Sequence, residues 1–163
     1  MNHPSSSRSD LAALVALLAA SAAIAGVSGA VTIGNVHTWY AALAKPAFNP
    51  PNALFGPVWT VLYIAMAIAA WRVWRVRERA AVGGALALYA GQLALNFAWS
   101  LLFFGAHQIG WALADILGLA VFLAATTVAF WRFDTVAGSL MVPYLAWVLF
   151  AAFLNFSILR LNG

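Results

Sequence analysis

Residues 83–104 read GGALALYAGQLALNFAWSLLFF, an unbroken stretch without a charged side chain. At about 1.5 Å of rise per residue, a helix of this length reaches about 33 Å, enough to cross the roughly 30 Å hydrocarbon core of a bilayer. Lipid offers the backbone no hydrogen-bond partners, so the stretch must satisfy its own peptide groups as a helix. We therefore predict a membrane-spanning helix over residues 80–104.

Four further apolar stretches of similar length predict four more spanning helices. They lie at about residues 11–33, 53–71, 110–131 and 136–159. Of the 163 residues, 65% are hydrophobic and only 7% are charged, whereas a soluble domain carries about 25% charged residues. The sequence thus predicts an all-α membrane protein, a five-transmembrane-helix bundle that forms a single domain over residues 11–163.

Residues 1–10 form a polar leader that we expect to be disordered. The stretch that follows could be the apolar core of a secretory signal peptide, but it is longer than the 7 to 15 residues typical of such a core. We interpret it as a retained helix. Its many Ala, Gly and Ser residues would allow close packing against a neighbouring helix.

The net charge of +4 is interpreted as a topology signal. Six arginines fall on the side of the N-terminus: Arg8, Arg72, Arg75, Arg77, Arg79 and Arg132. Only Lys45 and Arg160 fall on the other side, so the positive-inside rule predicts a cytoplasmic N-terminus. We expect no nucleic-acid partner, because no basic patch is interleaved with aromatic residues. Cysteine is absent, which excludes disulfides and thiolate metal sites; no metal site and no required cofactor are predicted.

The longest connection, residues 34–52, reads GNVHTWYAALAKPAFNPPN. Its three prolines restrict the backbone and its aromatic residues supply apolar surface, so we expect a long ordered loop that covers the bundle. His37 and His107 lie in the two loops on this side. Solvated loop histidines are the commoner interpretation, and contact with a metal or a haem iron is the alternative.

Aromatic and polar side chains recur at helical spacing in four predicted helices. Helix by helix, they are Phe55, Trp59 and Tyr63; Gln92, Asn96, Trp99 and Phe103; Trp111, Asp115 and Gly118; and Tyr144, Trp147, Ala151 and Asn155. Polar groups turn away from lipid, so these faces should converge. Such an interior suits a flat, largely apolar ligand. Equally, the aromatic rings could simply fill the bundle, with the amides bonding between helices.

Two further features keep alternatives open. Asp115 is the one carboxylate well inside a predicted span, where a structural role is the simpler interpretation and a proton-coupled role the alternative. A small multidrug transporter is disfavoured, because the first predicted helix has no carboxylate.

Gly83, Ala87 and Gly91 form a small-residue ridge that could meet a second copy in a homodimer or a neighbouring helix of the same chain.

Five ordered motifs resemble the TspO/MBR family over about residues 26–162. They are WYAALAKPAFNPP at 39–51, GPVWTVLY at 56–63, GQLALNFAW at 91–99, FFGAHQIGWALAD at 103–115 and PYLAWVLFAAFLNF at 143–156. The resemblance implies a five-helix bundle, often dimeric. It also implies binding of porphyrins such as protoporphyrin IX or haem, of sterols, and of benzodiazepine-type ligands in a pocket beneath the first loop.

The resemblance also implies which residues line the pocket. By motif position they are Trp59, Asn96, Trp99, Trp111, Trp147, Ala151 and Leu154, to which the loop and the second predicted helix add Trp39, Phe55 and Tyr63. The sterol-recognition pattern of the family falls at Leu154, Phe156 and Arg160. Here Phe156 replaces the expected tyrosine, which weakens the case for cholesterol. Phe48 likewise replaces a common tryptophan in the loop.

We therefore expect an integral membrane receptor or sensor that binds tetrapyrroles and regulates or transports them. The alternative is a weak enzyme that degrades porphyrin in light, with Trp59 and Trp147 as the candidate catalytic residues. If the host is bacterial, the cytoplasmic membrane is favoured, and an outer membrane is the alternative.

Overall fold

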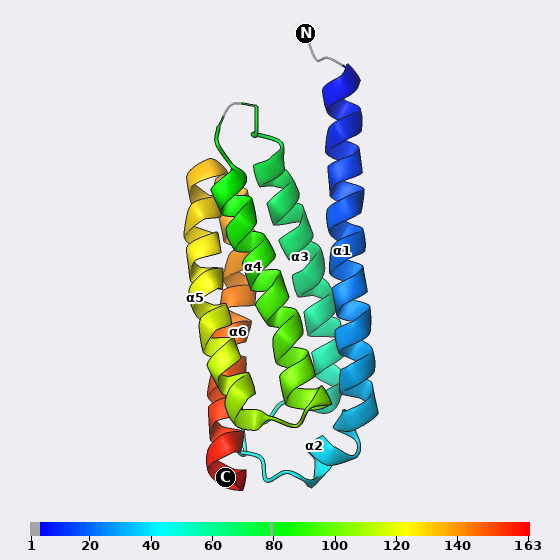
Figure 1. Ribbon diagram of the computed structural model, residues 1–163, viewed down its shortest axis with the longest axis vertical. Helices are drawn as coiled ribbons and strands as arrows, with labels where there is room; N and C mark the ends of the chain where they lie inside the picture. Colours follow the sequence, from blue (N-terminus) through cyan, green and yellow to red (C-terminus); the bar gives the residue numbers. More distant parts are fainter. Residues whose placement is uncertain (1–3, 79) are drawn as a thin grey trace.

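The computed structural model describes residues 4–78 and 80–163, and this part of the chain contains five long helices and no strand. The long helices are α1 (Pro4–Val36), α3 (Phe55–Trp74), α4 (Gly83–Ser100), α5 (Ile109–Phe133) and α6 (Thr135–Asn162). Each contains, or lies within, a segment long and apolar enough to cross a membrane. They run side by side along one axis (Figure 1). The prediction of an all-α, five-helix membrane protein is confirmed.

The leader is where the observed boundaries depart most from the prediction. Helix α1 begins at Pro4, so the expectation of a disordered leader is wrong for residues 4–10, while residues 1–3 lie outside the described part. The physical reason is a set of contacts to the far end of α3. The Asp10 carboxylate accepts a hydrogen bond from Arg77 at 2.7 Å, and the Asp10 carbonyl accepts one from the Trp71 indole at 2.8 Å.

A single residue, Asp134, connects α5 to α6 at the same end of the bundle. Its carboxylate accepts two hydrogen bonds from the Arg72 guanidinium, at 3.0 and 2.8 Å. It also caps α6 by accepting from the backbone N–H of Ala137 at 2.8 Å. The hydrogen bond from Arg72 is the main cause that lowers the pKa of Asp134 below its ordinary value. This carboxylate therefore ties the α5–α6 turn to the end of α3.

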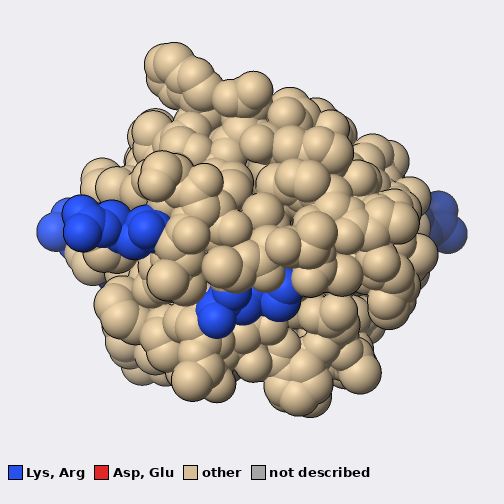
Figure 2. Space-filling model, turned by 90° about the horizontal axis from the view of Figure 1, so that it is seen from below, with Lys and Arg blue, Asp and Glu red and all other residues tan. Residues whose placement is uncertain are grey.

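The two ends of the bundle differ in charge, as the sequence predicted. The N-terminus and the connection between α3 and α4 lie at one end, and α2 (Trp39–Ala42) and the C-terminus lie at the other (Figure 1). Seen from the C-terminal end, the molecule shows only separate basic side chains, and no acidic side chain is in view (Figure 2). Which end faces the cytoplasm stays a prediction.

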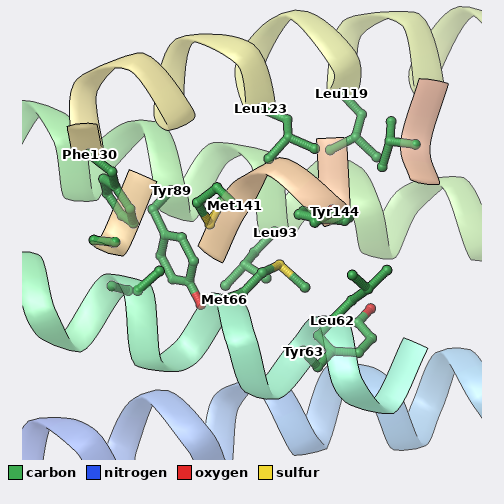
Figure 3. Close-up of a cluster of buried hydrophobic side chains, with 14 of the residues drawn as sticks. Leu62, Tyr63, Met66, Tyr89, Leu93, Leu119, Leu123, Phe130, Met141 and Tyr144 are labelled. Atoms are coloured by element: carbon green, nitrogen blue, oxygen red, sulfur yellow. The ribbon is translucent and has the colours of Figure 1, made fainter. Parts of the chain in front are cut away.

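The main core lies between α3, α4, α5 and α6 (Figure 3). Small residues let the helices approach closely: a Cβ on Gly91 would lie 2.8 Å from the Phe122 ring of α5. This end of the small-residue ridge is thus used within the chain. Gly83 and Ala87 are exposed on α4, so a homodimer contact through them stays a prediction.

Replacing Asp134 by alanine should lower the free energy of unfolding by about 1 kcal/mol, the usual cost of losing a helix cap. Asp134→Asn should cost less, because the amide oxygen still caps α6. The pKa of Asp134 is lowered in the folded protein, so its ionic contribution is present at neutral pH and is lost as the pH falls below the ordinary value of 3.8. Thermal unfolding of wild type, Asp134→Ala and Asp134→Asn in detergent at several pH values would measure these differences in stability. Equal stability of the three proteins would contradict the prediction.

Candidate functional site

A cavity of about 580 Å³ lies inside the bundle towards the end covered by α2. Its wall comes from α1, His37 after it, α2, η1 (Asn52–Leu54), α3, α4, η2 (Leu101–Gly105) and α6. The residues are Ala25, Ser28, Gly29, Thr32, Ile33, Val36, His37, Tyr40, Asn52, Ala53, Phe55, Gly56, Trp59, Thr60, Tyr63, Asn96, Trp99, Ser100, Phe103, Phe104, Trp147, Ala151, Leu154, Asn155 and Ile158. Helix α5, every residue of which is described, contributes none.

Aromatic rings form much of this wall. Trp59 lies edge-on to Tyr144, with ring centroids 6.0 Å apart. Phe55 meets Trp147 in the same way at 6.4 Å. Such pairs hold the rings in fixed orientations, so their faces and edges form a preformed apolar surface.

A wider helical turn supplies one side of the aromatic wall. Residues Leu101–Gly105 form a π-helix, η2, directly after α4. Phe103 of this turn stacks on Trp99 with centroids 5.3 Å apart, and it also meets Phe104 at 4.9 Å. Single turns of π-helix are rare and often occur at functional sites. This one places Phe103 and Phe104 in the cavity wall.

Asn96 of α4 connects three helices through its side chain. Its side-chain oxygen accepts a hydrogen bond from the Tyr63 hydroxyl of α3. Its amide nitrogen donates to the Tyr144 hydroxyl of α6 at 2.8 Å. Asn96 is 2% exposed, so these bonds form away from water. The expectation that amides bond between helices is correct for this residue.

Asn155 makes a second bridge nearer the covered end. Its side-chain oxygen accepts from the Trp99 indole at 3.1 Å, and its amide nitrogen donates to the Ile109 carbonyl at 3.0 Å. The bridge joins α6 to α4 and to the start of α5. The amides of Asn96 and Asn155 therefore each have their carbonyl oxygen and one N–H engaged by the protein.

The loop over the cavity is ordered, as predicted. Tyr40 is buried, and its hydroxyl donates to the Asn49 side chain at 2.6 Å; burial raises the pKa of Tyr40 to about 12. The Lys45 ammonium donates to the carbonyls of Tyr40, Ala41 and Leu43 at 2.8, 3.1 and 2.8 Å. Phe48 stacks on Phe153 of α6 at 5.2 Å, so phenylalanine preserves aromatic packing here.

Most of the predicted pocket residues do line the cavity: Phe55, Trp59, Tyr63, Asn96, Trp99, Trp147, Ala151 and Leu154. Trp111 does not. It is 70% exposed on the outside of α5, which turns Ala112 inward instead. Trp39 lies outside the wall, where it meets Phe103 at 5.5 Å and stacks on His107 at 4.2 Å.

The other marked residues also separate. Leu154 is buried and lines the cavity, whereas Phe156 and Arg160 are exposed, so the sterol-like pattern does not form one surface. Asp115 does not line the cavity. One of its carboxylate oxygens is buried without a hydrogen-bond partner among the described residues.

The contribution of α1 to the cavity is not predicted by the sequence pattern. Ser28, Gly29 and Thr32 lie in the cavity wall. Helix α1 carries no aromatic stripe, and its small residues gave no signal beyond close packing. Tyr40 was visible only as a member of the ordered loop, and His37 as a loop histidine for which contact with a metal or a haem iron was the alternative interpretation.

The wall is suited to binding. Among its residues there is no Lys, Arg, Asp, Glu or Cys, and His37 is its one histidine. The described part of the chain also holds no group of three or more His, Cys, Asp or Glu that could bind a metal ion. The residues of the wall therefore supply aromatic surface and hydrogen bonds rather than a nucleophile with its base.

Comparisons with known proteins agree with the motifs. Residues 14–161 match the TspO/MBR family. The chain is 48% identical to the human translocator protein, over 76% of this chain and 75% of the relative. It is 47% identical to the tryptophan-rich sensory protein of Cereibacter sphaeroides, over 76% and 77%. It is also 41% identical to the tryptophan-rich protein TspO of Archaeoglobus fulgidus, over 81% and 85%.

Removing the Asn96 bridge should destabilise the bundle. Asn96→Ala leaves the buried hydroxyls of Tyr63 and Tyr144 without their partner, at a cost of about 1 to 2 kcal/mol. Thr60→Val is the matched control, because the Thr60 hydroxyl lies in the same wall but bonds only to the Gly56 carbonyl of its own helix. Unfolding of both variants in detergent would measure the difference. Equal stability would show that the Asn96 bridge contributes nothing.

Proposed function

Because this chain belongs to the TspO/MBR family, we propose that it is an integral membrane receptor that binds tetrapyrroles, such as protoporphyrin IX or haem, inside its helix bundle. The observation that carries the proposal is the aromatic cavity. Its volume of about 580 Å³ lies within the roughly 300 to 1,000 Å³ of small-molecule sites. Trp59, Trp99 and Trp147 offer flat apolar faces to a flat ring.

The role of binding is regulation or transport of the bound pigment. The relatives named translocator protein and tryptophan-rich sensory protein support a role of this kind, and the cavity has no strong acid–base pair. Sterols and benzodiazepine-type molecules are secondary ligands of the same cavity in this proposal. We further propose a homodimer and a cytoplasmic-membrane location with the N-terminus in the cytoplasm.

A bulky residue placed in the cavity should abolish porphyrin binding. Gly29 lies in the wall, and a Cβ there would meet no atom within 4 Å, so Gly29→Phe can fill the cavity without a backbone clash. Gly26→Phe is the matched control, since Gly26 lies on the same helix, is exposed and is outside the wall. Tryptophan quenching by protoporphyrin IX in nanodiscs in the dark should saturate for wild type and Gly26→Phe, and not for Gly29→Phe.

Empty nanodiscs are the necessary blank, because porphyrins partition into lipid. Quenching in Gly29→Phe equal to that of wild type would overturn the interior site. Wild-type quenching equal to that of empty nanodiscs would overturn the interior site as well.

The second candidate function is light-dependent degradation of the bound porphyrin. It is favoured by the position of Trp59 and Trp147, both in the cavity wall, where an excited pigment could oxidise an indole. On illumination in air, wild type should then give new absorbing products faster than Trp59→Phe and Trp147→Phe. Dark binding by the two variants is the control. Products that form equally fast in all three proteins, or in empty nanodiscs, would exclude this activity.

A further inference from the structure

We propose that His37 binds a carboxylate of the ligand at the mouth of the cavity, so that the site selects flat apolar molecules that carry an acid group. This inference rests on the proposed function and adds the chemical class of the ligand's polar end. It assigns to His37 a specificity-determining contact.

The position of His37 is the first observation. It directly follows the last residue of α1, it is exposed, and it lies in the cavity wall. The wall extends along α1 from His37 to Ala25, which is about 18 Å at 1.5 Å per residue. A long flat molecule can therefore lie within the bundle while one end reaches water beside His37.

The second observation is that several other polar groups of the wall are engaged by the protein, although the buried hydroxyl of Ser28 has no hydrogen-bond partner among the described residues. The hydroxyls of Tyr40 and Tyr63 donate to Asn49 and Asn96. Thr32 and Thr60 bond to carbonyls of their own helices. His37 differs from these four, because its ring nitrogens have no hydrogen-bond partner among the described residues, and it differs from the buried Ser28 because it is exposed. An imidazole N–H, in either charge state, can donate to a carboxylate.

Neighbouring cations do not take this role. The Lys45 ammonium donates its hydrogen bonds to three loop carbonyls. Lys45 and Arg160 both lie outside the wall. The end view shows isolated basic side chains and no acidic one that would compete with a ligand carboxylate (Figure 2). His37 is thus the ionisable group of the wall best placed to meet an acid.

His107 offers a matched control at the same end of the bundle. It bonds through Nε2 to the Asn35 side chain at 3.0 Å and stacks on Trp39 at 4.2 Å. It does not line the cavity. A change at His107 therefore removes an imidazole that does not line the cavity, together with its bond to Asn35 of α1, and so reports the effect of loosening this end of the bundle.

The test compares protoporphyrin IX with its dimethyl ester, which has the same ring but no free carboxylate. Both are titrated in the dark into nanodiscs that hold wild type, His37→Ala, His37→Lys or His107→Ala, with empty nanodiscs as the blank. The measured quantity is the ratio of the two dissociation constants within each protein, because partitioning of each ligand into lipid then cancels between variants. Wild type and His107→Ala should prefer the acid to the ester by about fivefold, the usual scale for a solvent-exposed charge contact.

In His37→Ala the preference should vanish, and His37→Lys should restore it in a salt-sensitive form. An unchanged ratio in His37→Ala, with both porphyrins still bound, would overturn the role of His37 and leave the proposed function intact. If neither porphyrin binds wild type above the blank, the proposed function itself fails. If His107→Ala loses the preference as well, the effect belongs to the packing of the loop and the inference is wrong.

Discussion

In the hydrocarbon core of a membrane a polar side chain without a partner is costly, and Asn96 supplies partners to polar groups of two neighbouring helices at once. Its bonds to Tyr63 and Tyr144 fix the rotation of α3, α4 and α6 about their axes. With those rotations set, Trp59, Trp99 and Trp147 turn towards the same space. The cavity is thus a consequence of satisfying the buried amide.

Helix α1 completes the cavity, yet it is the least integrated part of the bundle. A smaller share of it is buried than of any other spanning helix in the described part of the chain. It is held at its ends, by Asp10 to Arg77 and by Asn35 to His107. A wall fastened at two ends and lightly packed between them can adjust to ligands of different thickness, whereas the core of α3 to α6 keeps its shape.

The sequence predicted the helices well because charge-free length is a strong signal in a membrane protein. It predicted the inward faces of α3, α4 and α6, where polar and aromatic residues share one stripe. It failed for α5, because Trp111 lies in the first turn of the helix, where an aromatic residue can face outward as well as inward. The π-helix η2 and the hydrogen bond from Arg77 to Asp10 depend on tertiary contacts that the periodicity of the sequence does not encode.

In the proposed complex, the ligand lies between α1 and the aromatic face of α3, α4 and α6. A structure of the protein determined with protoporphyrin IX bound in nanodiscs would locate it. We expect the ring beside Trp59 and Trp147, inside the cavity, with a carboxylate towards His37. A ring found on the outer face of α5 beside Trp111, or between two copies of the chain, would contradict it.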